Sequence, residues 1–390
     1  MKGPSLRTRL FLQILNKAKH GTIHLSLPDG KKETFGEGLP QIRIDVLDWS
    51  AIDLLFDKGD IGLAMATIEN TLVVDDMVAL VEWACKNDQD LSQALHGTWY
   101  GTLFAKFRHL LNFNSRSGAK KNIMAHYDLG NDFYRLWLDP SMTYSSAIFE
   151  TPEQTLFDAQ IAKYDRIIDT LNLKSGDHLL EIGCGWGGFY SRAVERTGCK
   201  VTAIMNSPEQ ARHNQKQIDA KGLGANVRLV QQDYRDITGQ FDKIASIEMI
   251  EAVGEKYWGT FFNKVSSSLK PKGAAVVQGI TIREDLFSSY RKKTDFIQQY
   301  VFPGGMLLTN NAFENNGKKN GMQLANMHEF GLSYAETLKI WRQNFQKAYP
   351  QVLELGFDDK FTRLWNLYLA YCEGAFRAGR INVGQFLLEK

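Results

Sequence analysis

Short apolar runs and amphipathic stretches alternate along residues 156–282. The apolar runs predict strands, and the stretches between them, where apolar residues recur every three or four positions, predict helices. The expected strands are 179–182, 200–205, 226–230, 241–247 and 274–282, and the expected helices are 156–171, 189–196, 208–221 and 258–269. Repeated strand and helix units imply an α/β fold, in which a parallel sheet carries helices on both faces.

The first 95 residues or so follow a less regular pattern, which predicts a small α+β domain. The expected strands are 22–27 and 42–47, the expected helices are 51–55 and 75–85, and a Pro-Asp-Gly turn at 28–30 follows the first strand. These elements contain no cluster of residues that indicates chemistry of its own.

An amphipathic helix is expected before the first strand. Its apolar side consists of Leu6, Leu10, Phe11, Ile14 and Leu15, and basic residues lie toward the other side. Such a helix either packs on its own domain or lies on a membrane surface, and the pattern leaves both readings open.

Residues 96–113 carry a wide stripe of apolar side chains that basic residues interrupt. The stripe consists of Trp99, Tyr100, Leu103, Phe104, Phe107, Leu110 and Leu111. Aromatic rings with basic neighbours favour the headgroup layer of an anionic membrane, but such a stripe also suits a helix that packs two domains together. The polar segment 112–122 follows, so we expect domains at 1–115 and 116–390.

Beyond residue 282 the regular alternation stops. Residues 283–330 form a long insertion, and insertions of this kind usually cover the substrate. Helices at 334–349 and 358–378 and a strand at 384–388 are expected after it.

Length and composition narrow the class of protein. A chain of 390 residues with 44% hydrophobic residues suits two globular domains, and no apolar run reaches the roughly 18 residues that cross a bilayer. Residues 1–19 alternate basic and apolar residues too finely for a signal peptide, so we expect a cytoplasmic protein. The four cysteines show no C-x-x-C spacing, which indicates neither a disulfide framework nor a metal site.

The net charge is only +2, but the acidic residues are unevenly spread. No Asp or Glu occurs in residues 1–28 or 91–127, and both segments hold several Lys and Arg residues. They predict a surface that meets anions, with an anionic phospholipid membrane as the expected partner. Nucleic acid is not expected, because the basic residues lie among apolar aromatic ones and no Asp/Asn-Pro-Pro-Tyr motif occurs.

The most informative stretch joins the strand at 179–182 to the next helix. Residues 181–187 read Glu-Ile-Gly-Cys-Gly-Trp-Gly, a spacing that is typical of S-adenosylmethionine (SAM) methyltransferases. Glycines in such a turn let the backbone approach a ligand and aim N–H groups at it. A dinucleotide fold uses much the same turn, but a phosphate loop is not expected, because no Gly-Lys-Ser/Thr follows.

Candidate site residues follow several of the expected strands. They are Gly183, Asn206, Asp233, Glu251 and Gln278. Because the carboxyl ends of parallel strands meet at one edge of a sheet, we expect these residues to share one cleft.

Two further features suit a bound nucleoside. Asp233 and Tyr234 form a polar and aromatic pair that can bind the edge of an adenine and cover its face. The polar and aromatic segment 126–147 is a candidate lid.

From about residue 126 onward, the chain resembles the cyclopropane-fatty-acyl-phospholipid synthases and the related mycolic acid cyclopropane synthases and methyltransferases. The motifs that carry the resemblance are His126-Tyr127-Asp128-Leu129, Tyr144-Ser145, the turn at 181–187, Gln232-Asp233-Tyr234-Arg235-Asp236, Tyr300-Val301-Phe302-Pro303-Gly304-Gly305, Phe330-Gly331 with Tyr334, and Gly374-Ala375-Phe376-Arg377. Their common order along the chain makes the resemblance specific. It implies a class I SAM-dependent methyltransferase with a Rossmann-like sheet, behind an N-terminal domain that looks only loosely like the extra domain of the phospholipid enzymes.

The resemblance also implies which residues contact SAM. They are Tyr144, Ser145, Gly183, Cys184, Gly185, Gly187, Asn206, Ser207, Gln210, Asp233 and Tyr234. The implied acceptor is a lipid acyl chain with a cis double bond. An alkene is a poor nucleophile, so the site must hold it against the methyl sulfonium in a dry, apolar slot.

Attack on the methyl group leaves a carbocation, from which a base must remove a proton. In the resembled family this base is thought to be bicarbonate, held by a Cys, a Glu, a His, a Tyr and a backbone amide. In this sequence Glu251, Ile280 and Tyr334 fit the pattern. Ser146 stands for the Cys and Gln278 for the His, and both can still donate hydrogen bonds to an anion.

Several alternatives stay open. Glu251, or Glu248 nearby, can serve as the base directly. Loss of a proton from the added carbon would close a cyclopropane, whereas loss from a neighbouring carbon would leave a methyl-branched or methylene-bearing alkene. Cys372 matches a cysteine that is sometimes proposed as catalytic in the family, but its apolar helix favours a packing role.

Other protein classes stay open as well. A small-molecule N-methyltransferase shares this lineage, and a lipid-binding protein could keep the fold without the chemistry. The resemblance favours a cytoplasmic enzyme that associates peripherally with membranes, and a homodimer is left open.

Overall fold

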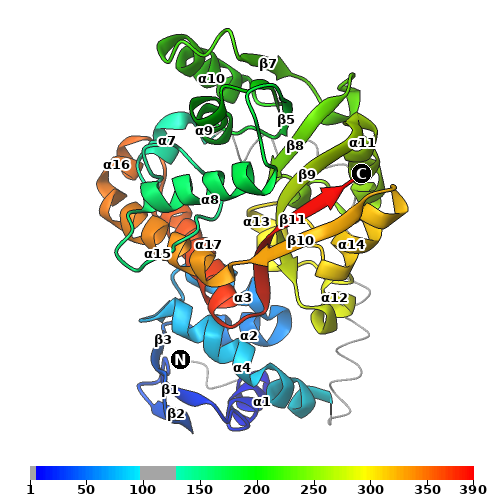
Figure 1. Cartoon of the computed structure of the whole chain (residues 1–390). Helices are drawn as coiled ribbons and strands as arrows, with labels where there is room; N and C mark the ends of the chain where they lie inside the picture. Colours follow the sequence, from blue (N-terminus) through cyan, green and yellow to red (C-terminus); the bar gives the residue numbers. More distant parts are fainter. Residues whose placement is uncertain (1–5, 97–128) are drawn as a thin grey trace. The chain divides into compact units, whose positions relative to one another are not determined.

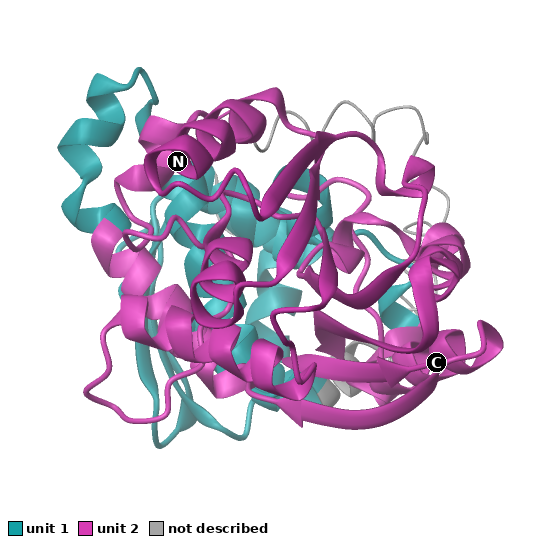
Figure 2. Cartoon of the chain, turned by 45° about the horizontal axis from the view of Figure 1, so that its top comes forward, with its two compact units in different colours: residues 1–118, 289–301, 345–380 teal, residues 119–288, 302–344, 381–390 magenta. Residues whose placement is uncertain are grey.

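The structure is a computed structural model that describes residues 6–96 and 129–390, apart from the side chains of residue 89 and residues 92–96. Two compact units make up the chain (Figure 2). Unit 1 consists of residues 1–118, 289–301 and 345–380, and unit 2 consists of residues 119–288, 302–344 and 381–390. The expected domain border, the aromatic stripe and the motif at 126–128 lie outside the described residues and stay predictions.

Unit 1 contains a four-stranded sheet with the strand order β2-β1-β3-β4. Its strands are β1 (Gly21–Ser26), β2 (Lys32–Glu37), β3 (Gln41–Val46) and β4 (Leu72–Val74). The expected turn joins β1 to the antiparallel β2, and β3 runs parallel to β1. Side chains of β3 alternate between exposed and buried, so one face of this sheet packs on the core.

The helices of unit 1 come from three parts of the chain. They are α1 (Leu6–Leu15), α2 (Trp49–Lys58), α3 (Asp60–Ile68), α4 (Met77–His96), α13 (Phe296–Tyr300), α16 (Tyr349–Glu354) and α17 (Asp359–Arg377). The expected N-terminal helix is confirmed as α1, and Leu15, Phe11 and Leu12 pack against the core of unit 1. Leu6 is 68% exposed, so the inner face of α1 is rotated from the expected stripe.

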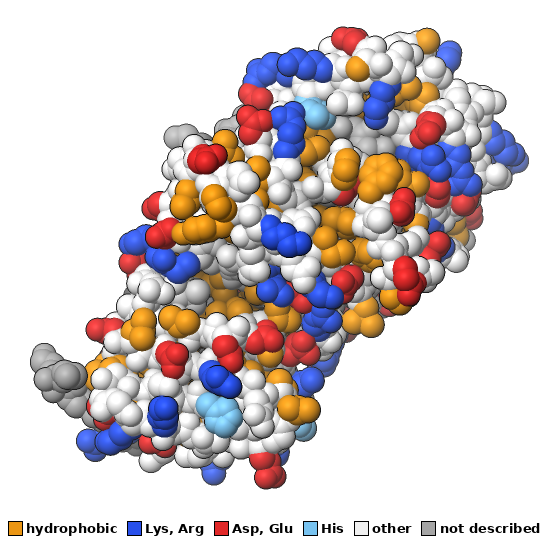
Figure 3. All heavy atoms as spheres, turned by 90° about the vertical axis from the view of Figure 1, so that its left-hand side faces the viewer, with side chains coloured by type: hydrophobic (Ala, Val, Ile, Leu, Met, Phe, Trp, Pro, Cys, Tyr) orange, Lys and Arg blue, Asp and Glu red, His pale blue; other side chains and the backbone are white. Residues whose placement is uncertain are grey.

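Basic residues near α1 are paired with acids from other parts of the chain. Arg7 lies 2.7 Å from Asp57, and Lys19 lies 2.6 Å from Asp90. On the face drawn in Figure 3, acidic and basic side chains are interspersed among hydrophobic ones. Although residues 1–28 contain no acidic residue, the surface around α1 therefore does contain acidic side chains, which come from other parts of the chain.

Unit 2 contains a seven-stranded sheet with the order β10-β11-β9-β8-β5-β6-β7 (Figure 1). Its strands are β5 (His178–Ile182), β6 (Lys200–Met205), β7 (Val227–Gln231), β8 (Phe241–Ile247), β9 (Leu269–Ile282), β10 (Gln323–Glu329) and β11 (Ile381–Glu389). The five strands from β5 to β9 are parallel, which confirms the expected α/β fold. β11 is antiparallel to β9, and β10 is antiparallel to β11.

Helices cover both faces of this sheet (Figure 1). On one face lie α8 (Leu156–Thr170), α9 (Gly188–Thr197) and α10 (Pro208–Ala220), and on the other lie α11 (Trp258–Ser268) and α14 (Asn310–Lys319). Ile167, Phe189 and Ile218 from the first three helices share one core cluster with the strands. On the other face, Phe313 of α14 stacks on Phe386 of β11 with ring centroids 3.9 Å apart.

The insertion at 283–330 differs from the expectation. It holds α12 (Glu284–Tyr290) and α13, but residues 310–329 contain α14 and the sheet strand β10. Strand β9 begins five residues before the expected strand at 274–282, and within this extension the register with β8 shifts and Lys272 has a φ of 64°. Two further helices, α7 (Asn131–Arg135) and α15 (Gly331–Lys347), complete the elements used below.

No helix in residues 6–96 and 129–390 is both long enough and apolar enough to cross a membrane.

Candidate active site

The glycine turn follows β5 directly and leads into α9. Gly183, Gly185 and Gly187 have φ angles of 83°, 52° and 86°, in the region that other residues rarely adopt. Gly187 is also crowded, since a Cβ there would lie 2.4 Å from Oδ1 of Asn214. The turn therefore requires glycine, and it brings the backbone to the carboxyl end of β5, where the sequence predicts the cofactor.

Asn214 of α10 braces this turn. Its Nδ2 donates to the carbonyl oxygen of Gly185 at 2.8 Å, and its Oδ1 accepts from the Tyr190 hydroxyl at 2.8 Å. The nearby Glu181 is 2% exposed, and burial raises the pKa of its carboxyl group to about 8, although the Tyr190 backbone N–H and Lys163 favour the ionised form. Glu181 therefore carries a proton over most of the neutral range.

Polar residues follow β6 and β7 as expected. Ser207 caps α10, because its Oγ accepts from the backbone N–H of Gln210 at 3.3 Å, while the adjacent Asn206 is exposed. After β7, the Asp233 carboxylate accepts from Nε of Arg235 at 2.8 Å and from a second guanidinium nitrogen at 2.5 Å. These contacts fix the positions of two strand ends that the sequence assigns to SAM.

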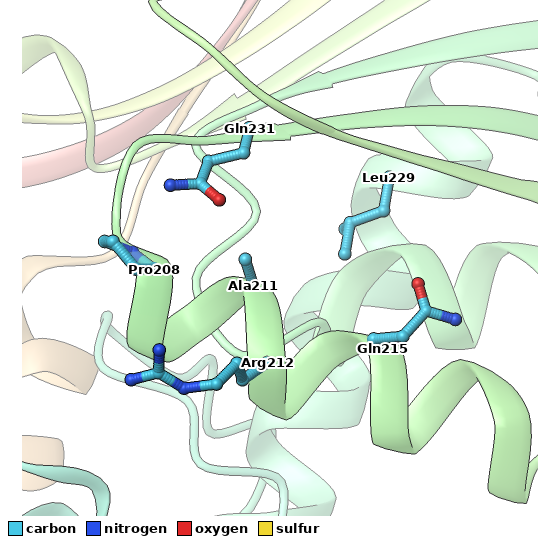
Figure 4. Close-up of a pocket in the computed structure, with 6 residues that line it drawn as sticks. All are labelled: Pro208, Ala211, Arg212, Gln215, Leu229 and Gln231. Carbon is cyan, nitrogen blue, oxygen red and sulfur yellow. The ribbon is translucent and has the colours of Figure 1, made fainter.

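A surface hollow of about 370 Å³ lies between α10 and β7 (Figure 4). Its lining residues are Pro208, Ala211, Arg212, Gln215, Leu229 and Gln231. None of them belongs to the predicted SAM set. Pro208 directly follows the predicted contact Ser207, so the hollow borders the row of strand ends.

Tyr144 belongs to a cluster of aromatic rings in unit 2. Its ring centroid lies 5.4 Å from that of Tyr134, 5.5 Å from that of Trp137 and 5.3 Å from that of Trp341. Trp186 of the glycine turn joins the cluster at 4.9 Å from Tyr134. The predicted cofactor contacts Tyr144 and the glycine turn are thus linked through packed rings.

Ser145 is fixed by two donors from α8. The Lys163 ammonium group donates to its Oγ at 2.6 Å, and Nε2 of Gln160 donates to its carbonyl oxygen at 2.9 Å. Lys163 has no exposed surface, and burial lowers its pKa to about 7, while Glu248, Asp139 and Glu181 partly oppose that shift.

Glu248 comes directly after β8 and accepts three hydrogen bonds. Its Oε1 accepts from the backbone N–H of Ser146 at 2.8 Å and from Nε2 of Gln278 at 2.8 Å, and its Oε2 accepts from the Tyr334 hydroxyl at 2.7 Å. Gln278 in turn accepts from Nε2 of Gln385 at 3.1 Å. The three donors come from a loop, strand β9 and α15, so separate parts of unit 2 surround this carboxylate.

Glu251 lies one turn further on, in the short 3-10 helix Ile250–Ala252. Its Oε1 accepts from the backbone N–H of Ile280 at 2.5 Å, and its Oε2 is buried without a hydrogen-bond partner among the described residues. Burial and the neighbouring Glu248 both raise the pKa of this carboxyl group. Glu251 is therefore the member of the pair that holds a proton.

Glu248 is the member of the pair that carries the negative charge. Burial raises the pKa of its carboxyl group, but the Tyr334 hydroxyl, the Lys163 ammonium group and the other donors all favour the ionised form. A carboxylate with three donors and a nearby cation, next to a protonated carboxyl group, has the properties of a general base.

The structure brings together all five residues that the resemblance assigns to an anion site. Tyr334, Gln278 and Ser146 surround Glu248, and Ile280 contacts Glu251. Ser146 contributes its backbone amide, because its hydroxyl group donates to the carbonyl oxygen of Ala147 at 2.9 Å.

Lys163 was missed by the sequence reasoning, and Glu248 was considered only as an alternative base. A signal for Lys163 exists, because α8 buries Gln160, Lys163, Tyr164 and Ile167 along one stripe. Two long polar side chains on the inner face of an amphipathic helix indicate a buried polar site.

The cysteines named from the sequence do not join the carboxylate pair. Cys184 is a buried residue of the glycine turn, and burial raises the pKa of its thiol. Cys372 lies on α17 in unit 1, whereas the pair lies in unit 2. Burial raises the pKa of the Cys372 thiol as well, which disfavours a thiolate.

Comparisons with known proteins identify the family of the chain. The family model described as mycolic acid cyclopropane synthetase matches residues 114–386. The tuberculostearic acid methyltransferase UfaA1 of Mycobacterium tuberculosis is 38% identical over 309 residues, covering 77% of this chain and 72% of that protein. A "probable fatty acid methyltransferase" of Pseudomonas putida is 33% identical over 374 residues, covering 95% of this chain and 92% of that protein.

Two further similarities concern cyclopropane synthases. The cyclopropane-fatty-acyl-phospholipid synthase of Escherichia coli is 35% identical over 286 residues, covering 72% of this chain and 71% of that protein. The solved structure of the mycolic acid cyclopropane synthase CmaA1, complexed with SAH and CTAB, matches with a TM-score of 0.66 at 32% identity. It covers 69% of this chain and 98% of that one.

Proposed function

The chain belongs to the mycolic acid cyclopropane synthetase family and is a SAM-dependent methyltransferase, and we propose that it methylates a cis double bond in an unsaturated acyl chain of a phospholipid. The observation that carries this proposal is the pair Glu248 and Glu251 after β8, the strand next to the glycine turn. Ser246 of β8 links the two strand ends, because its Oγ donates to the carbonyl oxygen of Ile182 at 3.0 Å.

The site supports the proposal because the reaction needs a base and apolar surroundings that exclude water. The alkene π electrons form a bond to the SAM methyl carbon, the carbon–sulfur bond breaks, and its electron pair leaves with S-adenosylhomocysteine. The second alkene carbon becomes a carbocation. A carboxylate then takes a proton from a neighbouring carbon, and the electron pair of that C–H bond forms the new π bond.

The walls around the pair include apolar side chains. Ile250, which lies between the two glutamates in the sequence, is fully buried. Ile250 and Phe313 also pack closely against Gly279, since a Cβ added there would lie 3.0 Å from Ile250 and 2.8 Å from Phe313. The Tyr144 cluster adds electron-rich ring faces, which stabilise a sulfonium or carbocation through cation–π attraction. Water would otherwise trap the carbocation, so these walls favour alkylation over hydration.

The proposed product keeps the transferred carbon as a methyl branch. Support comes from the two relatives named as methyltransferases, of tuberculostearic acid and of fatty acid, which the chain resembles over most of its length. The Ser146 and Gln278 replacements also depart from the ring-closing pattern that the sequence resemblance implies.

The test is incubation of the enzyme with SAM and vesicles of a defined monounsaturated phospholipid, followed by NMR of the acyl chain. We expect retained vinyl protons and a methyl signal on the chain. High-field ring protons would show a cyclopropane and would overturn the proposed product. Methylation of amines in lipid-free buffer, with none of the lipid, would overturn the proposed acceptor.

We also propose that the enzyme reaches its substrate at a membrane surface. The basic segment 91–127 and the aromatic stripe at 96–113 support this. Co-sedimentation should be stronger with anionic than with zwitterionic vesicles, and 0.5 M salt should weaken it, because salt screens charge. Equal binding to both vesicle types would contradict an electrostatic contribution.

A further inference from the structure

We propose that Glu248 is a built-in general base that takes the place of a bound anion, so that this enzyme turns over without bicarbonate. The inference rests on the proposed function, because it names the group that removes the proton in that reaction.

The hydrogen-bond donors around the two glutamates are already in use. The backbone N–H of Ser146, Nε2 of Gln278 and the Tyr334 hydroxyl all donate to Glu248, at 2.7 to 2.8 Å. The amide of Ile280 donates to Glu251. The Gln278, Tyr334 and Ile280 donors that the resemblance assigns to bicarbonate are therefore already bonded to one of two glutamates, and the Ser146 hydroxyl donates to Ala147.

Bicarbonate does not fit these residues as they stand. Its oxygens would have to displace the Glu248 carboxylate from three donors, and the displaced side chain would then face a second anion. Two like charges at contact distance in a partly buried site repel strongly. The nearby cation Lys163 is fully buried and balances one negative charge.

The backbone at Glu248 supports a dedicated role. Its φ of 51° lies in the left-handed region, which costs a residue other than glycine about 1 kcal/mol or more. A hydrogen bond from its backbone N–H to the carbonyl oxygen of Gln278, at 2.9 Å, holds this conformation. The conformation places the side chain among donors from three other parts of unit 2, so the strain has a structural use.

The proton transfer needs no acceptor other than the Glu248 carboxylate. SAM supplies the methyl group, S-adenosylhomocysteine leaves with the sulfur electron pair, and the carboxylate of Glu248 accepts the proton lost by the carbocation. Release of that proton to water regenerates the base. Glu251, which accepts from Ile280, remains protonated throughout.

The first experiment measures turnover and binding with the full-length wild-type enzyme. Methylation of the phospholipid vesicles is followed in buffer purged of carbon dioxide and again with 20 mM added bicarbonate, and binding of ¹³C-bicarbonate is followed by NMR line broadening. We expect equal turnover in both buffers and no broadening. A turnover that requires bicarbonate would overturn the inference while leaving the proposed function intact.

The second experiment uses Glu248 variants, with SAM binding measured for each to show that the protein is folded. Glu248→Gln should lower kcat by about 100-fold or more, in the range of a lost general base, with SAM affinity within about twofold. The exposed Glu153→Gln serves as the matched control and should retain wild-type turnover. Undiminished turnover in Glu248→Gln would overturn the inference.

A third variant tests whether the carboxylate stands where an anion would bind. Glu248→Gly suits the left-handed backbone and frees three donors. This variant should bind ¹³C-bicarbonate and regain turnover as bicarbonate is added. A Glu248→Gly protein that binds SAM but neither binds bicarbonate nor is rescued by it would contradict that part of the inference. Absence of any lipid methylation by the wild type would instead reject the proposed function.

Discussion

Glu248 and Glu251 are three positions apart but differ in the partners of their carboxyl groups. Glu248 accepts three side-chain or backbone donors, whereas Glu251 accepts one, from Ile280. This difference decides which of two identical residue types carries the charge. The assignment reverses the order suggested by the sequence, in which Glu251 came first.

The two glutamates should respond differently to the same substitution. Glu251→Gln keeps an oxygen for the Ile280 amide and resembles the protonated acid, so we expect a loss in kcat of about tenfold or less. Glu248→Gln removes the charge and should lose about 100-fold or more. Steady-state kinetics of both variants provide the test, and the opposite order would return the role of base to Glu251.

Glu181 should make stability depend on pH. Its folded pKa of about 8 lies above the ordinary value of 4.5, so its contribution to stability is complete below pH 4.5 and is lost as the pH rises through 8. In Glu181→Gln this dependence disappears. As the pH rises from 5 to 8.5, the free energy of unfolding of the variant should increase by roughly 1–3 kcal/mol relative to that of the wild type. Urea unfolding at the two pH values measures this change.

An unchanged difference between Glu181→Gln and the wild type at both pH values would contradict a raised pKa at Glu181. Comparison with the wild type at each pH cancels the groups that titrate independently of Glu181, whereas Lys163, which interacts with Glu181, contributes to the measured difference.

The sequence could identify the residues of the site better than their roles. Glu248 obtains its donors from Ser146, Gln278 and Tyr334, which lie 102, 30 and 86 positions away. No local pattern reports such contacts. The motif at 181–187 was predictable because its chemistry depends on a single continuous turn.

The turn between β5 and α9 is a region of dense packing as well as of unusual backbone. Gly187 and Gly222 both have positive φ, at 86° and 66°, but only Gly187 is crowded. A Cβ at Gly187 would lie 2.4 Å from Asn214 and 2.5 Å from Tyr190, while Gly222 has open space.

Substitution of these two glycines separates conformation from packing. Gly222→Ala should cost about 1–2 kcal/mol, the price of a left-handed backbone. Gly187→Ala carries the same cost plus the clash, so it should lose at least about 1 kcal/mol more and weaken SAM binding by about tenfold or more. Urea unfolding and calorimetry measure the two effects. Equal losses in both variants would show that the turn tolerates a methyl group.

Element prediction succeeded where burial is regular and failed where it is not. β6 and β8 are apolar runs in the middle of a sheet, and their bounds agree with the expected ones. β10 has largely exposed, polar side chains because it is an edge strand with one neighbour, β11. Its sequence therefore lacks the alternation that would have indicated a strand.

Every residue expected to contact SAM lies in unit 2. Ligand binding stabilises the structure that forms the site, by about 2.7 kcal/mol at a hundredfold excess over Kd. Hydrogen exchange with and without SAM should therefore show slower exchange at 182–190, 205–210 and 231–236. Strands β1 to β3 of unit 1 should exchange at unchanged rates.

Protection of β1 to β3 equal to that of the glycine turn would contradict a cofactor site confined to unit 2.

Contacts between distant parts of the chain explain why the positive charge around α1 was overestimated from the sequence. Arg7 and Lys19 are partnered by Asp57 and Asp90, which are distant in the sequence, so counting acids along the chain overestimated the local positive charge.

The position of β11 has a consequence for synthesis of the protein. β11 lies between β9 and β10, yet it is the last strand in chain order, and its Gln385 contacts Gln278 beside Glu248. A nascent chain can form the β5 to β9 strands while the ribosome is still translating, but β10 must wait for residues 381–389 to emerge. A ribosome that stalls before those codons leaves the reaction centre open on one side.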